Sequence, residues 1–241
     1  MHYIPILSTI ITFYFAAAVF TRYLSRKGTH LLMWSIGLLF FGMGTLAEVL
    51  LAFTFNEWFL KLWYVCGAML TAAWLGQGTV WLLVRKPGVA RTLTLILTAL
   101  SLLSVWLVFS TTLNTSAGGY DLLRPVSEQY QDILRRSDSI VALTIFLNIY
   151  GTITLVGGAL YSAYLFWRKR VLLNRMIGNI LIATGAMFPA IAGALRGSGV
   201  VDLLYISELI GVILMYVGFV KATSYRPIKN KVLEASAANQ S

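Results

Sequence analysis

The chain has 241 residues, of which 58% are apolar and only 12% are charged, whereas about a quarter of the residues in an average soluble domain are charged. Its net charge is +10 at pH 7, a value that in a soluble protein would suggest a nucleic-acid partner. The apolar residues are gathered in long runs, so the composition excludes an ordinary soluble domain and predicts a protein embedded in a lipid bilayer.

Seven apolar stretches follow one another, and each has about the 20 residues that a helix needs to cross a bilayer. They run over 3–22, 31–53, 58–84, 92–112, 139–167, 172–195 and 203–221. Inside lipid every backbone polar group must be paired within the protein, which leaves helices or a closed barrel. The segment 93–104 lacks the alternation of a barrel strand. We therefore predict an all-α integral membrane protein whose residues 1–222 form one seven-helix transmembrane domain.

The basic residues predict the orientation of this bundle. Most of them lie on alternate connections, at Arg22, Arg26, Lys27, Arg85, Lys86, Arg91, Arg168, Lys169, Arg170, Arg175, Lys221, Arg226, Lys229 and Lys231. Every acidic residue except Glu234 lies toward the opposite side. Because cytoplasmic connections of membrane proteins are rich in Lys and Arg, we expect the N-terminus outside and the C-terminus in the cytoplasm. Topology thus explains the charge, and no nucleic-acid partner is expected.

The connection over 113–138 is much longer than the others and is expected on the outer side. Within it, Val126, Tyr130, Ile133 and Leu134 fall on one helical face, with polar residues on the other. This spacing predicts a short amphipathic helix at the outer surface. It would act as a lid over the bundle or as a simple connector. The polar tail over 223–241 is expected to be a disordered cytoplasmic segment.

Ionisable residues inside predicted spans mark candidate sites, because each is costly to place in lipid. Glu48, Glu208 and Arg196 are expected at a similar depth near the outer side. Aromatic and amide side chains at compatible heights complete a candidate ligand-binding cluster, namely Trp63, Tyr64, Asn148 and Tyr205. The alternative is a structural ion pair, or carboxylates that are protonated or face water. Pro189 interrupts the stretch 172–195 and is a candidate conformational hinge.

Other polar residues and several absences narrow the function. Gln77 and Asn179 lie deeper and are expected to form hydrogen bonds between helices. His2 and His30 lie at the terminus and in a cytoplasmic connection, so no haem ligand pair is expected in the bilayer. Lys221 lies at the end of its stretch, which disfavours a retinal Schiff base, and the single Cys66 predicts neither a disulfide nor a metal site.

Three segments resemble the seven-transmembrane sensor region of bacterial histidine kinases. They are the Trp34 to Leu50 run with Leu46-Ala47-Glu48-Val49-Leu50, the run Trp63-Tyr64-Val65 to Ala73-Trp74-Leu75-Gly76, and the pair Gly185-Ala186-Met187-Phe188-Pro189 and Tyr205-Ile206-Ser207-Glu208. The resemblance implies a sensory helix bundle. The sequence departs from that family in its longer outer connection and in the short polar tail that stands where the kinase domain is expected.

We therefore expect a membrane receptor or regulatory protein, located in a bacterial cytoplasmic membrane, that senses a small ligand, lipid or partner at its outer half. The response would pass to a protein in the membrane or cytoplasm, or to a second copy of the chain. An accessory subunit of a membrane complex and a transporter or channel remain alternatives. An intramembrane enzyme that uses Glu48 and Glu208 as an acid/base pair is less favoured, because no catalytic set is recognised. No cofactor is expected.

Overall fold

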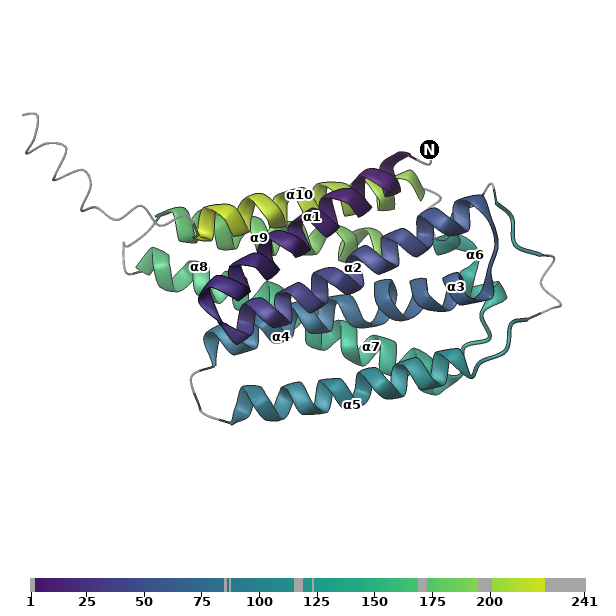
Figure 1. The fold of residues 1–241 in the computed structure, drawn as a ribbon, viewed down its shortest axis with the longest axis horizontal. Helices are drawn as coiled ribbons and strands as arrows, with labels where there is room; N and C mark the ends of the chain where they lie inside the picture. The colour runs from purple at the N-terminus through teal and green to yellow at the C-terminus, as the bar shows by residue number, and fades with distance from the viewer. Residues whose placement is uncertain are drawn as a thin grey trace, which may run out of the picture.

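The computed structural model describes residues 3–84, 86, 88–114, 119–122, 124–168, 173–194 and 201–223. Regular structure in these residues is helical, and Figure 1 shows the long helices lying side by side in one elongated bundle. Their bounds are α1 Tyr3–Arg26, α2 Thr29–Phe53, α3 Glu57–Trp63, α4 Thr71–Leu83, α5 Val89–Phe109, α6 Val126–Ile133, α7 Asp138–Thr152, α8 Gly158–Arg168, α9 Leu173–Ala194 and α10 Val201–Thr223. A π-helical segment, Tyr64–Leu70 (η1), joins α3 to α4, and another, Ile153–Gly157 (η2), joins α7 to α8.

Six of these helical runs in the described part of the chain are long and apolar enough to cross a membrane: α1, α2, Glu57–Leu83, α5, Asp138–Arg168 and the Tyr205–Thr223 part of α10. This confirms the all-helical, membrane-compatible character expected from the sequence. The helix α9 matches the predicted stretch 172–195 in place and spans 22 residues. The count of seven crossings and the orientation stay predictions.

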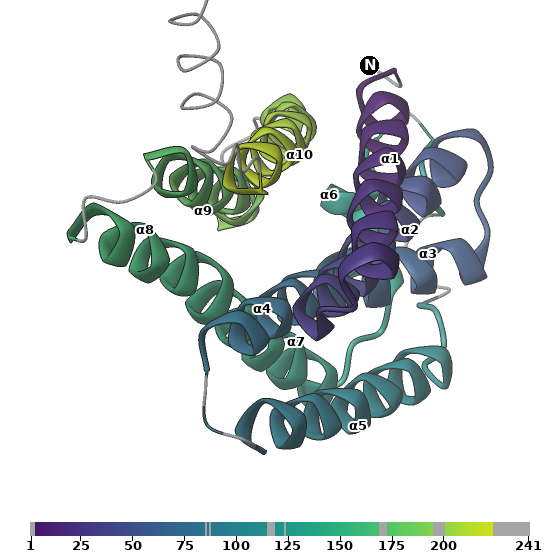
Figure 2. The same cartoon turned by 60° about the vertical axis from the view of Figure 1, so that its left-hand side comes forward.

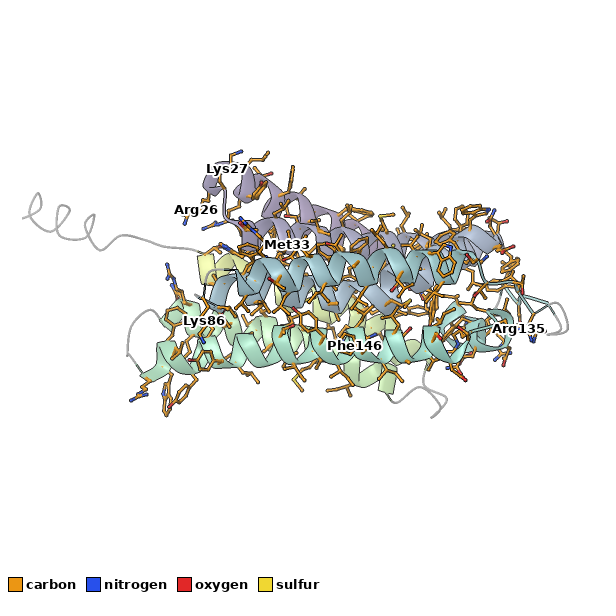
Figure 3. All side chains as sticks on the ribbon, turned by 90° about the horizontal axis from the view of Figure 1, so that it is seen from below. Arg26, Lys27, Met33, Lys86, Arg135 and Phe146 are labelled. Carbon is orange, nitrogen blue, oxygen red and sulfur yellow. The ribbon has the colours of Figure 1, made fainter. Side chains whose placement is uncertain are left out.

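Three labelled basic residues, Arg26, Lys27 and Lys86, lie at one end of the bundle, and Arg135 lies at the opposite end (Figure 3). The guanidinium of Arg22 donates a hydrogen bond of 3.0 Å to the backbone oxygen of Thr223, so the C-terminal ends of α1 and α10 meet. The described N-terminal residues of α1 therefore lie at the other end of the bundle from Thr223 (Figure 1).

The helices form a ring around a central space. Around the ring, α1 contacts α2, α2 contacts α4, and α4 contacts α7. The η2 segment and α8, which continue the chain from α7, both contact α9. Helix α9 contacts α10, and α10 contacts α1. Figure 2 shows α5 outside this ring, against α4, and shows α9 and α10 as a pair set apart from α7. Two apolar clusters result. The first gathers around η1, α5, α6 and α7, and the second around α1, α9 and α10.

The two π segments are stabilised by side chains that bind the carbonyl groups freed by the wider turn. In η1, Thr71 Oγ1 donates to the Cys66 oxygen at 2.7 Å, and Asn148 Nδ2 of α7 donates to the Ala68 oxygen at 2.7 Å. In η2, Thr154 Oγ1 donates to the backbone oxygen of Tyr150, in the last turn of α7, at 2.6 Å. The sequence did not predict these segments, because they lie within the apolar stretches 58–84 and 139–167 without interrupting them.

Two side-chain amides form hydrogen bonds between helices, and one of them holds α5 against the outside of the ring. Gln77 of α4 is fully buried and donates to the Ala90 oxygen at 2.9 Å and to Thr94 Oγ1 at 2.8 Å, both on α5. Its own amide oxygen accepts a hydrogen bond from the Tyr150 hydroxyl of α7. Asn179 donates to Ser162 Oγ at 2.8 Å, which links α9 to α8. The interhelical role predicted for Gln77 and Asn179 is confirmed.

Glycines allow α9 and α10 to touch along their backbones. A Cβ atom added at Gly185 would lie 2.6 Å from the Gly211 oxygen, and one added at Gly218 would lie 2.6 Å from the Gly178 oxygen. Gly178 and Gly185 are seven residues apart, as are Gly211 and Gly218, so each pair lies on one face of its helix. We call these four residues the glycine seam.

The long connection folds over one end of the bundle. Helix α6 buries Val126, Tyr130 and Ile133 against the first apolar cluster. Gln129 binds the preceding loop by donating to the Asp121 oxygen at 2.8 Å and accepting from the Asp121 amide at 2.9 Å. Together these contacts place α6 as a cap at the end where α2 and α10 carry their glutamates.

Candidate functional site

A cavity of about 810 Å³ occupies the centre of the helix ring. Its walls come from α2, the α3–η1–α4 run, the α7–η2 run, α9 and α10, and the tyrosine of α6 and the residues before α7 close one end. Both π segments contribute to the wall. A cavity of this size is within the range of small-molecule sites, about 300–1,000 Å³.

Most of the predicted cluster lines this cavity. The lining includes Glu48, Trp63, Tyr64, Asn148, Glu208 and the proposed hinge Pro189. These residues come from five separate helical runs, which explains why only their depth, and not their proximity, could be inferred from the sequence. Arg196, the cation proposed between the two glutamates, lies outside the described residues.

Tyr205 contacts the cluster without lining the cavity. It is buried on α10, and its hydroxyl forms a hydrogen bond with the carboxylate of Glu48 on α2. Since a phenol hydroxyl is the donor to a carboxylate, Tyr205 satisfies part of the hydrogen-bonding capacity of Glu48. Glu48 and Glu208 each have interactions within the protein. Glu48 itself is buried, with 5% of its surface exposed.

The electrostatic effect of Glu48 reaches Tyr120, in the connection before α6. Burial, and then the carboxylates of Glu48 and Asp121, raise the pKa of Tyr120 to about 12. The Tyr120 ring stacks on Phe55 with ring centres 4.8 Å apart. The connection before α6 therefore lies close to the glutamate end of the cavity.

Hydroxyl and amide groups line the wall formed by η1 and α7. Tyr64 and Thr144 lie with their hydroxyl oxygens 3.0 Å apart, and Thr144 donates its hydrogen to the Ile140 oxygen at 2.7 Å. Tyr64 is therefore the donor in this pair. Asn148 uses both amide hydrogens, one for the Ala68 oxygen and one for the Thr144 oxygen at 2.9 Å. These bonds fix the shape of the wall at Tyr64 and Asn148.

Arg136 is a lining residue that the sequence analysis missed. It lies in the short link between α6 and α7, and its guanidinium carbon lies 4.9 Å from the ring centre of Tyr130. Tyr130 in turn packs against Trp63, with ring centres 5.2 Å apart. The Nε of Arg136 is buried and has no hydrogen-bond partner among the described residues. The sequence shows two successive arginines here, and nothing in it tells which one turns inward.

No group of three or more His, Cys, Asp or Glu side chains suited to a metal ion occurs among the described residues. Buried Lys61 belongs to the fold rather than to the cavity. Its ammonium lies 2.5 Å from Glu57 Oε1 and donates to the Phe109 oxygen at 3.1 Å, which attaches α3 to the end of α5.

Comparison with protein-family models, with curated proteins and with solved structures gives no match to this chain. The resemblance to a histidine-kinase sensor region stays a prediction, and the cavity is interpreted from its own geometry.

Proposed function

We propose that this protein is a membrane receptor or regulatory protein whose ligand binds in the central cavity. The observation that carries the proposal is that one cavity of about 810 Å³ collects an ionisable or polar side chain from almost every wall, Glu48, Glu208, Arg136 and Asn148 among them. Charged groups within candidate membrane spans are expensive and are typically retained for function.

The proposed topology has seven crossings, with α9 as the sixth and the N-terminus outside a bacterial cytoplasmic membrane. It is supported by the basic end of the bundle, which carries Arg26, Lys27 and Lys86 (Figure 3), and by the opposite ends at which Tyr3 and Thr223 lie. Reporters that work on only one side of the membrane, fused in turn to each terminus, test it. Termini found on the same side would refute an odd number of crossings.

The proposed response is a displacement of α9 and α10 as a unit. The glycine seam holds these two helices in backbone contact, whereas Pro189 of α9 and Glu208 of α10 both line the cavity. A ligand can shift an equilibrium between two arrangements only if it binds them with different affinity. A ligand in contact with both α7 and the α9–α10 pair satisfies that requirement, because the distance between these walls sets the width of its site.

A receptor is favoured over a channel by the apolar packing around the cavity. Phe15, Leu38, Val212 and Phe219 are buried together in the second apolar cluster, which also includes the cavity-lining Leu155 and Met215. Polar lining concentrates near the glutamate end. An accessory-subunit role would instead be supported by stoichiometric co-purification of other membrane proteins with an empty cavity.

The test combines binding with a distance measurement. Native mass spectrometry of the protein purified in nanodiscs from its own membrane should show a retained small molecule. Ala186→Phe, which fills the cavity wall, should remove it, and Ala142→Phe, at an exposed site on the same bundle outside the cavity lining, should keep it. Spin labels at exposed Tyr161 on α8 and Val217 on α10 should report a shift when the molecule is stripped and restored.

Two outcomes would contradict the proposal. Retention of the molecule by Ala186→Phe would place its site elsewhere. An unchanged Tyr161–Val217 distance in the wild-type protein would remove the receptor role. Glu48→Gln and Glu208→Gln, with exposed Asp132→Asn as the matched control, then test whether the carboxylates contribute to binding. Affinity unchanged in both would assign Glu48 and Glu208 to the fold alone.

A further inference from the structure

The cavity has a lateral opening. Ile145, Ile149 and Ile153 recur every four residues along α7 and η2 and so form one stripe. All three line the cavity, and yet 54%, 54% and 66% of their surfaces are exposed. A residue can do both only where the cavity is open to the surface.

The packing of the helices explains this opening. Helix α9 packs against α8 and η2, but α7 makes no extensive contact with α9 or α10 within the described ranges. The α9–α10 pair thus diverges from the α7 wall toward the glutamate end, as Figure 2 shows. In a bilayer, a molecule would enter through this side from the hydrocarbon region.

One end of this opening carries a cation with an open donor. Arg136 precedes the first turn of α7, and its buried Nε lacks a partner among the described residues, whereas Glu48 and Glu208 already have interactions within the protein. Leaving a buried charged donor without an acceptor is unfavourable, and a carboxylate or phosphate oxygen is its strongest partner. The contact of its guanidinium with the Tyr130 ring, 4.9 Å from the guanidinium carbon to the ring centre, holds the group at this end of the cavity.

Depth and length match a lipid chain. From Asp138 to Ile153 the helix rises about 23 Å at 1.5 Å per residue, more than the about 15 Å of one hydrocarbon leaflet. The apolar lining continues to Leu155 and Met215 at the far end. A charged head group at the level of Arg136 would therefore contact a cation, and an alkyl chain along the isoleucine stripe would contact apolar side chains.

Resting on the proposed function, we infer that the ligand is a single-chain amphiphile with an anionic head group, which enters from the bilayer and binds with its head at Arg136 and its chain along Ile145, Ile149 and Ile153.

Equilibrium binding of radiolabelled palmitate and of hexadecanol, to protein in phosphatidylcholine nanodiscs, separates head from chain. Palmitate should bind more tightly than hexadecanol. Arg136→Gln should weaken palmitate about 10- to 100-fold, the loss expected for one charge-assisted contact, and leave hexadecanol unchanged. Arg135→Gln, at the exposed neighbour, is the matched control and should change neither. Arg136→Lys, which keeps the charge but not the planar fork, should fall in between.

The stripe is tested in the same assay. Ile149→Trp should weaken both palmitate and hexadecanol, whereas Leu160→Trp, at an exposed position of α8 outside the cavity lining, should weaken neither. Acetate and inorganic phosphate should not compete with palmitate at equal concentration. Competition by either would assign the site to a free anion and overturn the inference.

Equal palmitate affinity of Arg136→Gln and Arg135→Gln, in proteins with the wild-type melting temperature, would overturn it as well. The proposed function fails separately. If the molecule retained in nanodiscs is not an acidic amphiphile but still shifts the Tyr161–Val217 distance, only the ligand class is wrong. If nothing shifts that distance, the receptor role is wrong whatever palmitate does.

Discussion

The glycine seam makes the contact between α9 and α10 the most sensitive packing in the bundle. We consider Gly185→Ala. The added Cβ would lie 2.6 Å from the Gly211 oxygen and 2.9 Å from the Met215 nitrogen, both backbone atoms of α10. Backbone cannot rotate away as a side chain can, so the two helices must separate.

The magnitude follows from two opposing terms. Alanine favours a helix over glycine by about 1 kcal/mol, and forcing an extra methyl group into a packed interface costs about 1–3 kcal/mol. Gly157→Ala is the matched control, because nothing lies within 4 Å of its added Cβ, and it should experience the first term only. The free energy of unfolding of Gly185→Ala should therefore be about 1–3 kcal/mol below that of Gly157→Ala.

The measurement is reversible unfolding in mixed micelles titrated with a denaturing detergent and followed by circular dichroism. Gly211→Ala should behave like Gly185→Ala, since its Cβ would lie 2.7 Å from the Gly185 oxygen. The double variant should lose less than the sum of the two, because the first separation already makes room for the second methyl group. Equal stabilities of Gly185→Ala and Gly157→Ala, or strictly additive losses, would refute the seam.

Three further predictions concern polar contacts. Gln77→Leu should lower the free energy of unfolding by about 2 kcal/mol, since it removes three hydrogen bonds of about 0.6 kcal/mol each. Tyr150→Phe, which removes one of the three, should lower it by about a third of that amount. Equal losses of stability in the two variants would contradict this hydrogen-bond network. Arg22→Gln should speed hydrogen exchange in the last turn of α10, because the bond to the Thr223 oxygen is lost, whereas Arg26→Gln should not. The pKa of Tyr120, raised to about 12 from 10.0, predicts a stability contribution that is complete below pH 10 and is lost as the pH rises through about 12. Tyr120→Phe, which keeps the stacking on Phe55, should abolish that part of the alkaline loss, and an unchanged pH profile would count against it.

The sequence predicted the helical segments well because hydropathy in a membrane protein reports length directly. The stretch 172–195 corresponds to Leu173–Ala194, and 139–167 to Asp138–Arg168. At the basic end, α1 continues beyond the predicted residue 22 to Arg26. Long basic side chains can remain on a helix that leaves the hydrocarbon, and so the apolar run ends before the helix does.

The arrangement of the helices could not be predicted in the same way. Glu48, Asn148 and Glu208 were grouped from the sequence by their depth, which follows from counting residues from the end of each stretch, and all three line the cavity. The sequence did not tell which helices pack against one another, because a helix that is apolar on every side carries no stripe that marks its buried face. For that reason the sequence did not reveal that Gly185 meets Gly211. Arg135 and Arg136 lie in a link outside the helices, where no helical periodicity tells which of them turns inward.

Close backbone contacts also indicate where the bundle can and cannot change shape. A Cβ added at Gly44 would lie 2.7 Å from the Gly67 Cα, which fixes α2 against η1, and one added at Gly76 would lie 3.1 Å from the Gly151 oxygen, which fixes α4 against α7. Together with the glycine seam, these contacts divide the ring into two bodies, α2–α4–α7 and α9–α10, each rigid because its helices touch at backbone distance. The cavity and its isoleucine-lined opening lie between them. None of these backbone contacts joins the two bodies, so a ligand that fills this space is expected to change the separation of α7 from α10 rather than the packing within either body.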